Sequence, residues 1–285
     1  MPTAQIPRLT DQPVEVSPGG LIYGLHPRVR GSWTARHPRV VQLVSVVIFL
    51  AAWEIYGNTL NPIFLSGPSK VAAAFVELVA SGELLIAAAS SLGALSIGFS
   101  ISILAGIAIG ILMGRFQTFF NVLDPFITAL YNTPSVALIP LIQLWFGLGL
   151  EAKVVIVILS AFFPIVINTY AGVRHTGRGM VDVARAYGAN DRQVMTMVIL
   201  PSALPFIMAG MRLAVGRAVI GIVVAEFFTA VNGLGGMIIV FSNSFATAKL
   251  FVPVITLVAL GLALTAIARG LERYFASWKE TERAS

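Results

Sequence analysis

The chain has no cysteine and very little charge. None of its 285 residues is a cysteine, which excludes disulfide bonds, iron–sulfur ligation and thiol catalysis. Only 11% of the residues are charged, whereas 57% are hydrophobic, and the mean hydropathy is +0.86. A soluble domain needs a charged shell that this chain cannot build. The composition therefore indicates an integral membrane protein.

Motifs for catalysis and nucleotide binding are also missing. None of the four lysines follows a glycine, so there is no Walker A loop, and no G-x-S-x-G or suitable carboxylate pair occurs. His26, His37 and His175 are not at metal-ligand spacing. The net charge of +6 lies in loops and not in a basic stripe with aromatics, which argues against nucleic acid. We therefore expect a chain that is not an enzyme and that itself binds no metal, cofactor or nucleic acid.

Long apolar runs dominate what is present. They approach the ~20 residues that cross a bilayer, and they are continuous instead of alternating, which favours helices over a β-barrel. Pro125, Pro134 and Pro140 interrupt the third run and predict a broken helix there. We expect six membrane spans, within residues 40–56, 84–114, 119–150, 154–173, 204–228 and 252–268.

Two local patterns refine this picture. Pro68 predicts the first turn of a short helix whose apolar face lies on the membrane surface and holds Val71, Phe75, Leu78 and Val79. In the second run, glycines recur every fourth residue, which predicts close approach of another helix. These glycines are Gly106, Gly110 and Gly114.

Basic residues set the expected orientation. Arginine clusters at residues 28–39, 115, 174–192 and 269–283 would all be cytoplasmic under the positive-inside rule. An even number of crossings between clusters then puts both termini in the cytoplasm and leaves Lys70, Lys153 and Lys249 in exterior loops. We expect residues 1–39 to form a cytoplasmic tail, residues 40–276 a six-helix membrane domain, and residues 277–285 a second tail.

A charged segment lies between the fourth and fifth runs, in residues 181–201. Gly188 can cap one short helix and Asn190 or Asp191 can begin another, which Pro201 ends or bends. This predicts a rigid helix–turn–helix with Tyr187 near its tip. The residues alone leave open an ordinary positive-inside loop.

The spacing in this segment resembles the EAA loop of permease subunits of binding-protein-dependent ABC importers. That pattern is Glu-Ala-Ala, three residues, Gly, nine residues, Ile, any residue, Leu-Pro. Here Asp, Val and Val replace its Glu, first Ala and Ile. Stretches such as "LSGPSKV", "FFPIVINTYAGV", "AEFF" and "GLGGMI" resemble the nitrate/taurine/sulfonate branch, over about residues 62–276. The matching positions of the loop are Asp182, Val183, Ala184, Gly188, Val198, Leu200 and Pro201.

This resemblance implies a type I ABC importer permease, with six transmembrane helices and a cytoplasmic coupling helix, in a bacterial inner membrane. It implies a homodimer with a second permease copy, a pair of ABC ATPase subunits that bind ATP and Mg²⁺, and an extracytoplasmic substrate-binding protein. Alternating access would import a small anion such as nitrate, taurine or an alkanesulfonate. The alternatives are a secondary transporter or channel that acts alone, and a membrane scaffold.

Under this resemblance the coupling loop spans about residues 174–203. Arg185 would either pair with an acidic group of the ATPase or anchor the loop at the membrane interface. The expected ATPase-coupling residues are Asp182, Ala184, Arg185, Tyr187, Gly188 and Ala189.

Polar residues within apolar runs are candidates to line a substrate path, with hydrogen bonding between helices as the alternative for each. They are Asn132, Thr133, Gln143, Asn168, Thr169 and Arg217. Most other ionisable residues of the runs are expected near span ends, where snorkelling explains them. These are Glu54, Asp124, Arg212 and Glu226.

Overall fold

A computed structural model describes residues 38–229 and 232–275, which form helices and no strand. The chain divides into two units, Met1–Ala52 and Trp53–Ser285. Helix α2 (Pro38–Thr59) begins in the first unit, and the remaining helices belong to the second. Both expected tails fall almost entirely outside the described residues, as do His26, His37 and Lys279.

Besides α2, four described helices are long and apolar enough to cross a membrane. With α2 these make five, and a sixth candidate span is α5 together with η1 and α6, which are bent by 93°. The all-α membrane fold is thus confirmed, with up to six spans in the described part of the chain. The long helices are α4 (Glu83–Arg115), α7 (Leu150–His175), α10 (Leu200–Thr229) and α12 (Thr247–Phe275).

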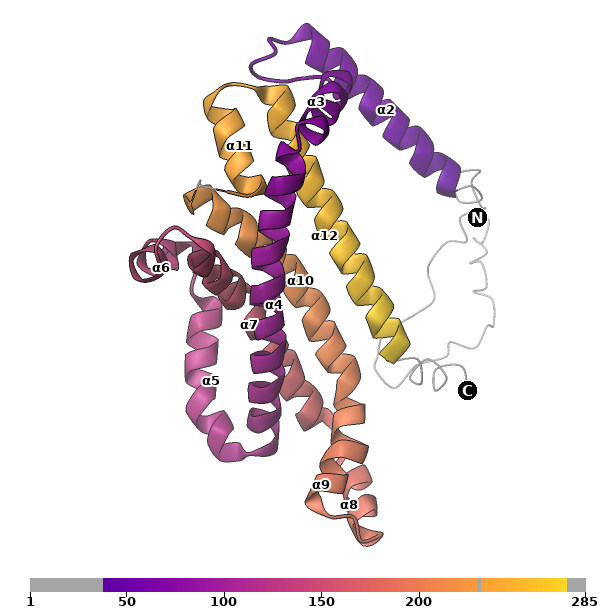
Figure 1. The fold of residues 1–285 in the computed structure, drawn as a ribbon. Helices are drawn as coiled ribbons and strands as arrows, with labels where there is room; N and C mark the ends of the chain where they lie inside the picture. The colour runs from indigo at the N-terminus through magenta and orange to yellow at the C-terminus, as the bar shows by residue number, and fades with distance from the viewer. Residues whose placement is uncertain (1–37, 230–231, 276–285) are drawn as a thin grey trace, which may run out of the picture. The chain divides into compact units, whose positions relative to one another are not determined.

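The other helices are shorter, and Figure 1 shows their arrangement. They are α3 (Pro68–Ala80), α5 (Gln117–Asn132), η1 (Ser135–Leu138), α6 (Ile139–Phe146), α8 (Arg178–Ala186), α9 (Asp191–Gln193), η2 (Val194–Ile199) and α11 (Leu234–Asn243).

The core of the second unit is the contact of α4 and α10 with α7. A β-carbon at Gly106 would lie 2.9 Å from Cγ2 of Ile165, and one at Gly110 would lie 2.6 Å from Cβ of Thr169. On α10, a β-carbon at Gly210 would lie 2.7 Å from Cβ of Asn168. The predicted close approach at the α4 glycines is therefore confirmed, since only hydrogen fits between these backbones.

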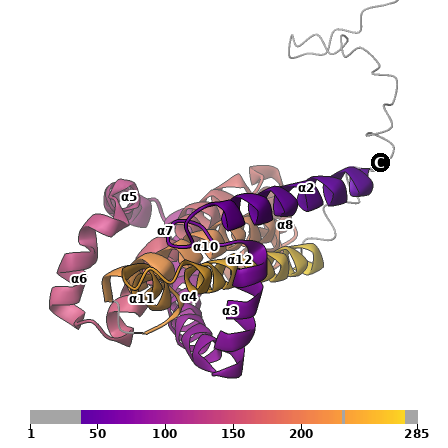
Figure 2. The same cartoon turned by 90° about the horizontal axis from the view of Figure 1, so that it is seen from above.

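The third span is broken at Pro134, whereas Pro125, from which a break was also predicted, lies inside α5. Pro134 separates α5 from η1, and Pro140 lies in the first turn of α6. Figures 1 and 2 both show α6 turned away from the direction of α5. The bend exposes the end of α5 and the start of η1 beside α7 and α10, where the pocket described below lies.

Helix α3 begins at Pro68, as predicted. It buries Val71 and Leu78 of the predicted face, together with Ala74, against α4 and α12, whereas Phe75 is 45% exposed. The glycine-rich segment after α10 leads into helix α11, which is too short to cross a membrane.

Candidate functional site

The segment between α7 and α10 forms the predicted helix–turn–helix. Helix α8 ends at Ala186, and Gly188 follows in the left-handed region with φ of +82°. Asn190 then starts α9 with a capping box, in which its side chain accepts from the Gln193 amide and the Gln193 side chain accepts from the Asn190 amide, each at 2.9 Å. Both ends of the turn are therefore fixed by hydrogen bonds.

The six expected coupling residues lie together at this turn. Tyr187 is 90% exposed at its tip, and Asp182 is also exposed. Ala184 and Ala189 pack inward on a cluster that includes Val194 and Ile199. Between α8 and η2 lies an apolar groove of about 500 Å³ that Val183, Ala184 and Val198 help to line.

Arg185 has a partner within this chain. Its Nη2 lies 3.3 Å from Oδ1 of Asp191, and the other oxygen of Asp191 lies 3.1 Å from Nη2 of Arg115 at the end of α4. Asp191 thus joins the turn to α4. Because all three side chains are at least partly exposed, each pair adds little stability.

Of the two expectations for Pro201, an end of the second helix of the turn is wrong, because the helix continues through this proline. Residues Asp191–Thr229 form one continuous helical span of 39 residues, about 58 Å long. A π-helical turn, η2, immediately precedes Leu200 and Pro201. Since proline cannot donate a hydrogen bond, the wider turn lets the helix continue through it. The turn is therefore joined to α10 without a break in the helix.

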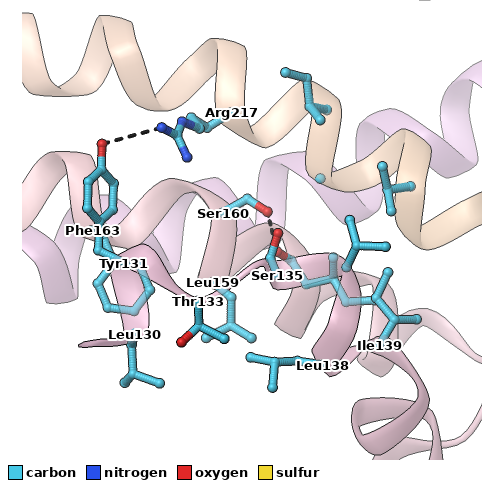
Figure 3. A pocket seen from close by; sticks show the side chains of 15 residues that line it. Leu130, Tyr131, Thr133, Ser135, Leu138, Ile139, Leu159, Ser160, Phe163 and Arg217 are labelled. Carbon is cyan, nitrogen blue, oxygen red and sulfur yellow. Dashed lines mark hydrogen bonds between the residues drawn. The ribbon is translucent and has the colours of Figure 1, made fainter. Parts of the chain in front are cut away.

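A pocket of about 220 Å³ lies between the broken third span, α7 and α10. Arg217 is the one charged side chain among the described residues that line it. Its Nη2 lies 3.3 Å from Oη of Tyr131, and its guanidinium carbon lies 5.3 Å from the centre of that ring. Figure 3 shows this pair at one end of the pocket, with the hydroxyls of Ser135 and Ser160 turned toward each other. A cation beside hydroxyl groups suits a small anion.

The structure brings two of the six predicted path residues into this pocket, Thr133 and Arg217. Asn132 donates to its own helix at Thr128 O, 2.7 Å away. Asn168 donates to Pro164 O at 2.8 Å and packs on Gly210 of α10.

The remaining two predicted path residues lie on α6 and α7, away from this pocket. The Nε2 atom of Gln143 on α6 is buried without a hydrogen-bond partner among the described residues. Thr169 is fully buried against Gly110, where it serves the packing of α4 on α7.

A buried ion pair was missed by the sequence reasoning. Lys153, expected in an exterior loop, is 4% exposed in the first turn of α7. Glu226, expected to snorkel, is fully buried in the last turn of α10. Its Oε1 lies 3.5 Å from Nζ of Lys153. Both expectations are wrong because neither side chain reaches solvent; each finds its partners within the helix bundle.

Further hydrogen bonds hold this pair. The Ser91 hydroxyl of α4 lies 2.8 and 2.9 Å from the two carboxylate oxygens of Glu226 and accepts from the Leu234 amide at 2.9 Å. The Gly235 amide donates to Glu226 at 2.9 Å, and Lys153 donates to Asn232 O at 2.5 Å. We call these six residues the buried ion cluster.

Residues 102–280 match the family described as "binding-protein-dependent transport system inner membrane component". The chain is 37% identical over 242 residues to a protein of Escherichia coli (strain K12) that carries the name of an aliphatic sulfonates transport permease protein, SsuC. The match covers 84% of this chain and 92% of that protein.

A second relative carries a different name. The riboflavin transport system permease protein RibX of Chloroflexus aurantiacus is 34% identical, over 89% of this chain and 95% of that protein. Among solved structures, the inward-facing MetNI methionine ABC transporter matches with a TM-score of 0.56 and 18% identity, over 67% of this chain and 96% of the matched chain. The fold of an ABC transporter permease is thereby supported from coordinates as well as from sequence. The chain belongs to the family of binding-protein-dependent transport system inner membrane components, the membrane-spanning permeases of ABC importers.

Proposed function

We propose that this permease imports a small organic anion of the sulfonate class, such as an alkanesulfonate or taurine. The observation that carries the proposal is the pocket in which Arg217 is the one charged lining residue. A sulfonate group offers oxygens to a guanidinium and to hydroxyl donors, the groups that this pocket presents. The name of the SsuC relative supports the same class.

The driving force would come from partners. We infer that a second permease copy completes the path and that ABC ATPase subunits, which would bind ATP and Mg²⁺, receive the turn at Gly188 in a surface cleft. Both termini would then be cytoplasmic, since the turn faces the ATPases. Closure of the ATPases on ATP would push α10 through the continuous helix, and the pocket would alternate between the two sides of the membrane.

Uptake into proteoliposomes tests the substrate. With the ATPase and a binding protein reconstituted, we expect Arg217→Gln to lower uptake of labelled ethanesulfonate about tenfold, because a charge-assisted contact is lost. Arg212→Gln is the matched control, since Arg212 lies on the same helix but pairs with Glu272 at 2.9 Å and does not line the pocket. Unchanged uptake by the Arg217 variant would remove Arg217 from the path.

Uptake of labelled riboflavin tests the alternative substrate, because the RibX relative is named as a riboflavin transport permease. We expect no riboflavin uptake by the wild-type transporter and no effect of excess riboflavin on sulfonate uptake. Riboflavin uptake without sulfonate uptake would contradict the proposed substrate class, while leaving the assignment to the family intact.

A further inference from the structure

The buried ion cluster and the turn at Gly188 lie at opposite ends of the helix bundle. Arg115, at the end of α4, contacts the turn through Asp191, whereas Ser91 lies 24 residues earlier in the same helix, about 36 Å away. Lys153 is in the first turn of α7, whose last turn precedes α8, and Glu226 is in the last turn of α10. The two sites are therefore separated by about the thickness of a membrane.

Within the cluster, one carboxylate joins several elements. Glu226 contacts Ser91 of α4, Lys153 of α7 and the Gly235 amide in the first turn of α11. Lys153 also holds Asn232 O just before α11, and Ser91 holds the Leu234 amide. The start of α11 is therefore attached to α10 by a charged group that is not exposed to solvent.

The fit at this attachment is close. Gly233 has φ of +102°, and a β-carbon there would overlap the Glu226 carboxylate. A β-carbon at Gly235 would lie 2.7 Å from Cβ of Glu226 and 3.0 Å from Val223 O. These glycines let the backbone of α11 approach α10 closely enough for the carboxylate to accept the Gly235 amide.

A buried ion pair is a poor way to gain stability alone, because desolvation offsets much of the attraction. Charged residues within membrane helices instead point to function. Helix α11 is too short to span and returns the chain from α10 to α12 at the end opposite the turn. Its inner face packs through Leu234, Met237 and Phe241, while Val240 is 56% exposed.

We propose that Glu226 is a positioning residue that makes α11 move with α10. This inference rests on the proposed transport function. Because the helix that begins at Asp191 continues to Thr229, motion that enters near Gly188 reaches Glu226 through one rigid element. The buried ion cluster transfers that motion to α11, and Lys153 with Ser91 holds the carboxylate in position to do so.

Thiol labelling measures the position of α11 directly, since the chain has no natural cysteine. Ser242→Cys places one reporter at an exposed position of α11. In the assembled transporter, we expect its labelling rate to differ between the nucleotide-free state and a state trapped with ATP and vanadate. Labelling is scored on this chain after separation from the partner subunits.

Two variants perturb the cluster in different ways. Glu226→Gln removes the charge, and Gly235→Ala keeps the charge but forces α11 away from α10. For both we expect labelling in the nucleotide-free state to rise at least about fivefold, because local opening of α11 becomes easier, and the response to ATP to disappear. The matched controls are Glu272→Gln, another paired glutamate, and Gly216→Ala, where no atom lies within 4 Å of the added carbon.

The outcomes separate a positioning role from a structural one. Labelling is measured on complexes that remain assembled after gel filtration, and thermal stability is measured separately. If the variants lose thermal stability but keep the wild-type ATP response, the cluster is only structural and the proposal fails. If the chain with Ser242→Cys alone responds to ATP and both variants label at the rates of that chain, Glu226 does not fasten α11. If the chain with Ser242→Cys alone shows no ATP response, the proposed transport mechanism itself fails. The labelling rates in the nucleotide-free state test the attachment of α11 independently.

Discussion

Single glycines decide how closely the helices of this permease approach. Gly110 of α4 faces Thr169 of α7, and a β-carbon there would lie 2.6 Å from Cβ of Thr169 and 2.8 Å from Val166 O. Because backbone atoms cannot move aside as a flexible side chain can, the contact has no room for a larger residue. Gly93 occupies the same helix with no atom within 4 Å of an added β-carbon.

At the residue scale, we expect Gly110→Leu to destabilise the permease by about 1–3 kcal/mol through overpacking. The measurement is the midpoint of thermal unfolding in detergent, followed by gel filtration. Gly93→Leu is the control and should leave the midpoint nearly unchanged. Equal midpoints for the two variants would show that the contact between α4 and α7 tolerates a side chain.

Some contacts between residues could be predicted from the sequence and others could not. The spacing of Gly106, Gly110 and Gly114 predicted their packing role, since a period of four places them on one ridge. Lys153 and Glu226 are 73 residues apart, and nothing in their local sequence names either as a partner of the other. Their only signal was the presence of opposite charges within strongly apolar runs, which indicates a buried pair but does not identify it.

Among the structural elements, the turn at Gly188 was the most predictable from the sequence. Gly188, Asn190 and Gln193 satisfy local rules for helix ends, which depend on neighbouring residues alone. The continuation of the helix through Pro201 was not predictable, because it depends on a π-helical turn that only the structure reveals. Helix α11 was missed for a similar reason: its first turn is held by side chains of α4 and α10.

The capping box makes a prediction for this element. We expect Asn190→Ala to destabilise the start of α9 by about 1 kcal/mol, since the Gln193 amide loses its acceptor. Hydrogen exchange of residues 191–199 should then quicken several-fold. Asn190→Asp keeps an acceptor and serves as the control. Unchanged exchange in the alanine variant would mean that packing of Val194 and Ile199, and not the cap, fixes this helix.

At the scale of the whole molecule, three sites lie along one helical connection. In the proposed mechanism, the turn at Gly188 receives displacement, α10 carries it past the pocket at Arg217, and the buried ion cluster delivers it to α11. Composition and hydrophobic pattern were sufficient to predict the helical membrane fold. They did not separate path residues from packing residues, because a polar side chain in an apolar helix satisfies either role, as Thr169 and Arg217 illustrate.

The most direct test is the amount of substrate imported per ATP hydrolysed, measured in proteoliposomes that contain Gly188→Val. Valine is strained at φ of +82°, whereas asparagine tolerates this region, so Gly188→Asn is the control. We predict that the valine variant remains assembled with its ATPase, hydrolyses ATP, and imports at least about tenfold less substrate per ATP, while the asparagine variant stays near wild type. Wild-type import per ATP by the valine variant would contradict the claim that force enters this permease at the turn.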